Sequence, residues 1–182
     1  MDIRLVAMDL DGTALQADRK TFSPRLEAAL SAAHRRGVYI VPVTGRQFFF
    51  LPPAVHKNVE WAGLAVLSNG GEVRRLADGR VLSGHYLRAE ALLPLVEGAG
   101  KLGVPIELSA GEGLHLTRAD WEYQRRIDGP LRFHLTEVLD RFGHEVEDMS
   151  AFCGSAPAVD KVNLPYIPDE TRAAAERMLN SL

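Results

Sequence analysis

The sequence has little cysteine, no long apolar run and no excess of positive charge. Cys153 is the only cysteine among 182 residues, so no disulfide can form within the chain, and we expect a small buried thiol in a reducing compartment. The formal net charge of −3 disfavours nucleic acid and anionic membranes as partners, because both favour basic surfaces. No apolar segment approaches the roughly 20 residues of a transmembrane helix, and the first residues lack a secretory signal pattern. These absences predict a cytoplasmic protein that binds neither nucleic acid nor membrane.

The first part of the chain contains three short, mostly apolar runs that are typical of strands buried on both faces. They are residues 3–8 (IRLVAM), 38–43 (VYIVPV) and 64–67 (LAVL). Between the first two, Ser23 and Pro24 read as a helix N-cap and first helical residue, and Gly37 as a helix stop. The order strand, helix, strand, connection, strand predicts a doubly wound α/β layer.

The pattern changes after Gly71. Asp78-Gly79 lies between two short strand-like runs and favours the tight turn of a hairpin. Pro94 lies within a helical pattern, so the helix either begins near it or is kinked there. The further elements that we expect are strands at 104–108, 114–117 and 159–164 and helices at 92–102, 119–126 and 169–182. This second half therefore predicts an α+β unit.

Polar or small residues follow each of the three early strands. They form the clusters Asp9 to Thr13, Thr44 to Arg46 and Ser68 to Gly71. In open α/β sheets, ligands bind beyond the carboxyl ends of the strands. We therefore expect the three clusters to meet at one rim and to form the functional site.

Asp9-Leu10-Asp11-Gly12-Thr13 carries the strongest chemical signal in this rim. Two carboxylates one residue apart at a strand end can share a divalent cation, and hard oxygen ligands suit magnesium. A cation that neutralises phosphate charge lets one carboxylate attack a phosphoryl group while the other transfers protons. The same pattern taken alone also occurs as a plain turn after a strand.

Three segments resemble motifs of the haloacid dehalogenase superfamily, in its Cof-type phosphatase branch. These are MDLDGT at Asp9, VPVTGR at Thr44 and LSNGGEV at Asn69. The resemblance implies a partial doubly wound parallel, Rossmann-like α/β core with an inserted α+β cap domain. It assigns residues 1–80 to the core and 81–182 to an incomplete cap.

By this resemblance Asp9 is the nucleophile and a magnesium ligand. Asp11 is the general acid/base and binds magnesium through its backbone carbonyl. Thr44 is expected to hydrogen-bond the transferring phosphoryl group, with the amide of Gly45 beside it. The implied cofactor is Mg²⁺, and the implied substrate is a small phosphorylated metabolite such as a sugar phosphate.

Two further phosphate- or substrate-binding candidates have competing interpretations. Arg46 is expected to reach the substrate or to brace the cap, unless it forms a surface salt bridge. Asn69 is expected to line the rim, unless it only tolerates a left-handed turn beside Gly70 and Gly71.

The family's third and fourth motifs, which supply a lysine and further acidic magnesium ligands, are not found in this sequence. Without the strands that carry them, the strand ending at Asp9 is expected to be an unpaired sheet edge. We expect either a truncated chain or a second chain, identical or different, that completes the core.

The leading hypothesis is a magnesium-dependent phosphomonoester hydrolase that forms an aspartyl-phosphate on Asp9. The alternative is a catalytically impaired fragment or a non-catalytic module that binds phosphate or a partner. A receiver domain is disfavoured, because receivers have adjacent acids at the first strand end and no inserted cap. Mutases and other sugar-phosphate phosphatases share these motifs, so the reaction subtype stays open.

Overall fold

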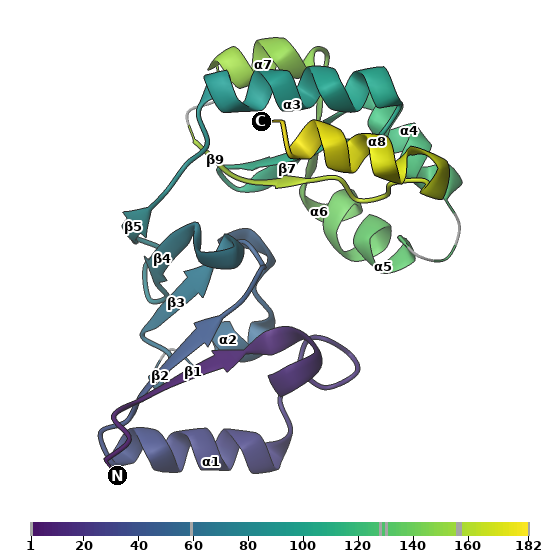
Figure 1. Cartoon of the computed structure of the whole chain (residues 1–182). Helices are drawn as coiled ribbons and strands as arrows, with labels where there is room; N and C mark the ends of the chain where they lie inside the picture. The colour runs from purple at the N-terminus through teal and green to yellow at the C-terminus, as the bar shows by residue number, and fades with distance from the viewer. Residues whose placement is uncertain (1, 59, 128, 130, 156–157, 182) are drawn as a thin grey trace. The chain divides into compact units, whose positions relative to one another are not determined.

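The computed structural model describes residues 2–58, 60–127, 129, 131–155 and 158–181. The chain forms two compact units, Met1–His85 and Tyr86–Leu182 (Figure 1). The division falls after the hairpin that follows Gly71, so both hairpin strands belong with the first unit. Among the described residues, no helix combines the length and apolar character that crossing a membrane requires.

The first unit is built on a five-stranded sheet in the order β1-β2-β3-β4-β5. Its strands are β1 (Leu5–Asp9), β2 (Tyr39–Val43), β3 (Leu64–Leu67), β4 (Glu72–Arg75) and β5 (Val81–Gly84). The first three are parallel, and the last two add an antiparallel hairpin. The three apolar runs therefore form strands as predicted, with the Asp78-Gly79 turn between β4 and β5. The fold class is the expected Rossmann-like α/β type.

Helix α1 (Pro24–Arg35) connects β1 to β2. The Ser23 hydroxyl accepts a hydrogen bond from the backbone N–H of Leu26 at 3.2 Å, which confirms the predicted N-cap. Leu30 of α1 packs in one apolar core with Met8 and Ile40 of the sheet. A short helix, α2 (Pro53–His56), adds Ala54 and Val55 to the same core. Figure 1 shows α1 lying alongside β1 and β2.

Among the described residues of this unit, only one face of the parallel strands is covered. Side chains alternate between the two faces of a strand, and Met8, Ile40 and Ala65 point into the core. Leu5 and its register partner Tyr39 point the other way and are exposed. Within the described residues β1 pairs with β2 alone, so it is the sheet edge that we expected. This unit thus has an open apolar sheet face beside a free strand edge.

The second unit is built on a four-stranded sheet in the order β8-β7-β6-β9. Its strands are β6 (Glu107–Ala110), β7 (Gly113–Thr117), β8 (Gly143–Val146) and β9 (Val159–Asn163). Its helices are α3 (Ala89–Leu102), α4 (Arg118–Arg126), α5 (Arg132–His134), α6 (Asp140–Phe142), α7 (Met149–Ser155) and α8 (Asp169–Leu179). Pro94 lies inside α3, five residues after the helix begins. Strand β6 starts at Glu107, later than the predicted residue 104.

Both faces of this second sheet are covered. Gln124 of α4 and His134 of α5 hydrogen-bond Glu107 on one face. On the opposite face the ring of Phe152 of α7 stacks on His115, the register partner of Leu108. Every residue of β6 is buried as a result. Figure 1 shows α3 and α7 on one side of the sheet and α5 and α6 on the other.

Cys153 lies on α7 and is a free, buried thiol. Its sulfur is part of the apolar packing of the second unit, with 2% of the residue exposed. Burial raises the pKa of this thiol, which keeps it protonated and unreactive. The prediction of a small buried apolar residue is confirmed.

Candidate functional site

The first loop of the site begins where β1 ends. Leu10 is fully buried, whereas Asp9 and Asp11 on either side of it are exposed. The buried leucine anchors the loop in the core while the two carboxylates face away from it. Gly12 has a φ of 76°, a left-handed conformation that glycine adopts without a Cβ clash. The turn closes through a hydrogen bond from the Leu15 N–H to the Leu10 carbonyl at 2.9 Å.

The second loop follows β2 and contains Thr44, Gly45 and Arg46. The Thr44 hydroxyl accepts the backbone N–H of Arg46 at 3.1 Å, and the residue is buried. Gly45 packs against the loop after β3 so closely that a Cβ there would lie 2.5 Å from Oδ1 of Asn69. Only glycine fits this position without moving Asn69.

The third loop follows β3 and has an unusual backbone. Ser68, Asn69 and Gly70 have φ values of 52°, 57° and 98°, so three consecutive residues are left-handed. The Asn69 N–H donates to the Thr44 carbonyl at 3.3 Å, and the Ser68 N–H donates to the Arg46 carbonyl at 3.0 Å. Asn69 therefore combines both features considered from the sequence, a left-handed turn and a side chain at the rim. Strain of this kind persists where neighbouring contacts over-determine the backbone.

Arg46 joins these loops through its side chain. The guanidinium donates two hydrogen bonds to the carboxylate of Asp11, Nε to Oδ2 and Nη2 to Oδ1, each 2.7 Å long. It also donates to the carbonyls of Arg19 at 3.0 Å and Phe50 at 3.3 Å. Its hydrogen bonds to Asp11 outweigh the opposing effect of burial and lower the pKa of that carboxyl group. Four of the predicted residues, Asp11, Thr44, Arg46 and Asn69, are thus linked by hydrogen bonds across the three loops.

Asp9 lies at the same rim, since it is the register partner of Val43, the residue before Thr44. In the described part of the chain its carboxylate makes no hydrogen bond or ion pair, unlike that of Asp11. An exposed carboxylate without a protein partner is a group that can attack a substrate or bind a cation.

The oxygen atoms of Asp9 and Asp11 fit a magnesium ion that takes most of its ligands from water and substrate phosphate. No three acidic, histidine or cysteine side chains of the described residues are grouped so that they could share a metal. Magnesium is often held by one or two carboxylates together with water and substrate phosphate oxygens. Asp9 offers its carboxylate, while the carboxylate of Asp11 is engaged by Arg46. Asp11 would therefore contribute its backbone carbonyl, as the family resemblance implies.

Two further partners of Arg46 lie outside the three polar clusters predicted at the rim. The carbonyl of Arg19 lies in a tight turn in which Asp18 accepts the N–H groups of Lys20 and Thr21. The ring of Phe50 lies 4.5 Å from the Arg46 guanidinium carbon. An Asp-x-x-Thr turn is visible in the sequence, but its approach to Arg46 depends on tertiary structure.

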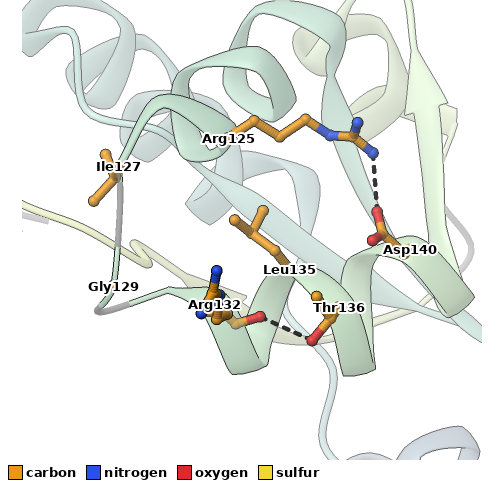
Figure 2. A pocket seen from close by; sticks show the side chains of 7 residues that line it. All are labelled: Arg125, Ile127, Gly129, Arg132, Leu135, Thr136 and Asp140. Carbon is orange, nitrogen blue, oxygen red and sulfur yellow. Dashed lines mark hydrogen bonds and ion pairs between the residues drawn. The ribbon is translucent and has the colours of Figure 1, made fainter.

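The second unit contains a separate pocket of about 320 Å³ (Figure 2). Its lining residues are Arg125, Ile127, Gly129, Arg132, Leu135, Thr136 and Asp140. The guanidinium of Arg125 pairs with Asp140 at 2.9 Å, and the Thr136 hydroxyl donates to the Arg132 carbonyl at 2.9 Å. Figure 2 shows these contacts along the pocket wall. None of these residues was a candidate from the sequence.

The first unit is an α/β layer whose sheet carries three loops at one rim. These are an Asp-x-Asp loop, a Thr-Gly-Arg loop and an Asn-Gly loop, and together they define the class of protein. The chain belongs to the family of haloacid dehalogenase-like hydrolases, whose model matches residues 6–163. The superfamily resemblance stated from the three motifs is therefore confirmed.

Solved structures of this superfamily share the fold at low sequence identity. One is a phosphatase from Bacteroides thetaiotaomicron, BT1666, with a TM-score of 0.62, 20% identity, 86% of this chain covered and 53% of that chain. Another is the subclass IIB sugar phosphatase BT4131, with a TM-score of 0.71, 15% identity, and 97% and 64% covered. A third is a haloacid dehalogenase-like hydrolase from B. subtilis, with a TM-score of 0.67, 18% identity, and 98% and 67% covered. The chain thus spans between about half and two thirds of the length of these structures.

Proposed function

We propose that this protein is a magnesium-dependent phosphomonoester hydrolase that forms an aspartyl-phosphate on Asp9. The observation that carries the proposal is the contrast between the two carboxylates of the first loop. Asp9 is exposed and has no protein partner in the described residues, whereas Asp11 is held by Arg46 at 2.7 Å. One acid is thus free to attack and the other is fixed in place.

The chemistry divides into two halves. In the first, a carboxylate oxygen of Asp9 forms a bond to phosphorus, the ester P–O bond breaks, and the leaving oxygen takes a proton from the carboxyl of Asp11. In the second, Asp11 takes a proton from water, whose oxygen attacks phosphorus and releases phosphate and the Asp9 carboxylate. The ion pair with Arg46 stabilises the ionised form of Asp11, so it favours this second half and works against the protonated form that the first half uses. The backbone amide of Gly45 lies in the loop where the transferring oxygens would be bound.

Magnesium, when bound, would neutralise phosphate charge and allow the anionic Asp9 to approach an anionic ester. The carboxylate of Asp9 and the carbonyl of Asp11 would hold it. We propose small phosphorylated metabolites, sugar phosphates in particular, as the substrate class. Support comes from the family motifs and from the similarity in fold to a subclass IIB sugar phosphatase.

The test is hydrolysis of p-nitrophenyl phosphate, and then of a panel of sugar phosphates, with and without Mg²⁺. Asp9→Asn should lower turnover by at least about 1,000-fold, because the nucleophile is removed. Asp2→Asn is the matched control, since Asp2 is also exposed but lies outside the site. Magnesium-dependent turnover that survives in Asp9→Asn would refute the proposal. Folded wild-type chain that binds inorganic phosphate without turnover would favour a non-catalytic phosphate-binding module.

We also propose that a second polypeptide completes the core by docking on the free edge of β1. The support is that this edge and the open face beside it are unpaired in the described residues, next to Asp9. If the second polypeptide is another copy of this chain, specific activity should rise with protein concentration in step with dimer formation measured by sedimentation. Specific activity that stays constant over a concentration range of about 100-fold, while the protein remains monomeric, would rule out a second copy of this chain as the partner.

A further inference from the structure

We propose that Arg46 is a positioning residue, which holds the Asp11 carboxylate and ties four segments of the site together. This inference deepens the proposed function and rests on it for the reaction that Asp11 serves. The residue was considered from the sequence as a substrate ligand, a brace for the cap or a surface salt bridge. Its contacts in the first unit point to a different role.

The first observation is the bidentate pair with Asp11. Nε and Nη2 of Arg46 lie 2.7 Å from the two carboxylate oxygens. Two parallel N–H···O bonds fix both the position and the rotation of a carboxylate, which a single ammonium cannot do. Arg46 is only 7% exposed, so the pair is shielded on the arginine side, while Asp11 is 42% exposed toward the rim. The geometry therefore leaves Asp11 accessible and immobile.

The second observation is how the guanidinium uses its donors. Arginine carries five N–H groups and no acceptor. Nε–H and one Nη2 proton bind Asp11, the other Nη2 proton binds the Arg19 carbonyl, and one Nη1 proton binds the Phe50 carbonyl. One N–H of Nη1 has no acceptor among the described residues. A group with this many internal hydrogen bonds is built for fixing its surroundings rather than for gripping a phosphate.

The third observation is which segments these bonds join. Arg19 has a left-handed φ of 55°, and its carbonyl accepts from Arg46. The turn around it is fixed from both ends, because Gln16 N–H donates to the Thr21 carbonyl and Asp18 accepts from the Thr21 hydroxyl. The carbonyl of Arg46 itself accepts the N–H of Ser68 after β3. One residue thus connects the Asp11 loop, the Arg19 turn, the Phe50 segment and the loop after β3.

Arg74 offers a matched control within the same unit. Its guanidinium makes a bidentate pair with Glu72, with distances of 2.6 and 3.0 Å, and lies 5.0 Å from the ring of Phe48. Arg46 likewise pairs with an acid and lies over the ring of Phe50. Both pairs are partly buried, but Arg74 lies in the β4–β5 hairpin and outside the rim.

The activity test compares Arg46→Lys with Arg74→Lys. Lysine keeps the charge but cannot form the bidentate pair and reach two carbonyls, so Asp11 should lose its fixed orientation. We expect kcat with p-nitrophenyl phosphate to fall by about 100-fold, the cost of a small misplacement of a catalytic group, with KM within about threefold. Arg74→Lys should leave both constants unchanged at a similar loss in thermal stability. A rise in KM with unchanged kcat would overturn the proposal in favour of a substrate ligand, and equal effects of the two variants would show a merely structural role.

A second measurement does not depend on turnover, so it separates this inference from the proposed function. The Nε–Hε signal of Arg46 in a ¹⁵N spectrum of the full chain should be sharp and protected from exchange, and Asp11→Asn should abolish that protection. Addition of inorganic phosphate with Mg²⁺ should leave the signal in place. A signal that exchanges freely in the wild type, or one that shifts with phosphate in a saturable way, would contradict the positioning role even in a chain without activity.

Discussion

The two sheets of this molecule differ in how completely they are buried. In the second unit every residue of β6 is buried, and Leu108 is 0% exposed. In the first unit Leu5 of β1 is 56% exposed and its partner Tyr39 of β2 is 72% exposed. The parallel strands of the first sheet carry apolar residues on both faces, whereas one face of the second sheet also carries the buried polar residue Glu107. The second unit covers both faces with its own helices, whereas the first covers only the face beneath α1.

The sheet of the second unit is buried by helices of the same unit. The sheet of the first unit has apolar residues on a face that no helix of that unit covers among the described residues. Burial of apolar surface is the main favourable term in folding, so the apolar area left exposed on the open face of the first unit adds nothing to its stability. The same face lies beside the free edge of β1, the strand that ends at Asp9. The functional rim is therefore carried by the less covered of the two sheets. Four predictions test this contrast, from the largest effect to the smallest.

The largest effect is expected for Leu108→Ala in the second sheet. The side chain is fully buried, so its truncation should lower the free energy of unfolding of that unit by about 2–5 kcal/mol. Leu5→Ala makes the same chemical change on β1, where the side chain is exposed, and should cost less than about 0.5 kcal/mol. The chain has two tryptophans, Trp61 and Trp121, one in each unit. Fluorescence during urea unfolding of Trp61→Phe and Trp121→Phe backgrounds would report each unit separately.

The outcome that would break the comparison is equal destabilisation by the two leucine truncations. That result would mean that the face carrying Leu5 is covered in solution, by a second copy or by another part of the chain. Sedimentation at the same protein concentration distinguishes these cases, since only a second copy doubles the mass.

A smaller effect is expected for the buried polar cluster that helps to cover the second sheet. Glu107 is 0% exposed and accepts hydrogen bonds from His134 at 2.7 Å, Gln124 at 2.9 Å and Asn163 at 3.3 Å. His134→Ala removes the shortest of these and leaves a buried carboxylate under-satisfied. It should lower the free energy of unfolding by about 1–3 kcal/mol, read from Trp121. Asn163→Ala, which removes the longest bond, is the control and should cost less; the opposite ranking would contradict this account.

Local signals were enough to predict much of the first unit. The apolar runs predicted β1, β2 and β3, and Ser23-Pro24 predicted the start of α1. These succeed because strand burial and helix caps depend on neighbouring residues. The placement of Thr44 and Asn69 at one rim followed from the rule that parallel strands end at one sheet edge.

The features that were not predicted depend on contacts between distant residues. Strand β8 (Gly143–Val146) has no apolar alternation and exists because it pairs in parallel with β7. The pair between Arg46 and Asp11 joins residues 35 positions apart, so no spacing rule reveals it. The free edge and open face of β1, in contrast, were expected from the sequence, because the segments that should flank this strand were not found in it.

A modest pH effect is expected in the second unit from His115. Burial lowers the pKa of His115, and His144, whose ring centroid lies 5.2 Å away, lowers it further, against the Ala110 carbonyl, which raises it. The fold therefore favours the neutral ring. The associated stability is complete above the unfolded pKa of about 6.5 and is lost as the pH falls through that value toward the lower folded pKa. The melting temperature read from Trp121 should thus drop by a few degrees between about pH 7.5 and about pH 5.5. These values lie roughly one unit above and one unit below the unfolded pKa.

His115→Phe should flatten this pH dependence, because phenylalanine can still stack on Phe152 but does not titrate. His85→Gln is the control, since His85 is exposed and lies in the first unit. A pH dependence that persists in His115→Phe would place its origin in another group.

The smallest change in stability is expected on the open face itself. Tyr39→Ser should alter the free energy of unfolding of the first unit by no more than about 0.5 kcal/mol, because the ring is 72% exposed. It should nevertheless reduce binding of the dye 8-anilinonaphthalene-1-sulfonate, since the dye needs a contiguous apolar surface. Val81→Ser on β5, a partly exposed apolar residue at the other edge of the sheet, should leave dye binding nearly unchanged. Loss of stability together with loss of dye binding would mean that Tyr39 is already packed against a partner, and the contrast between the two sheets would then describe the isolated chain and not the protein in solution.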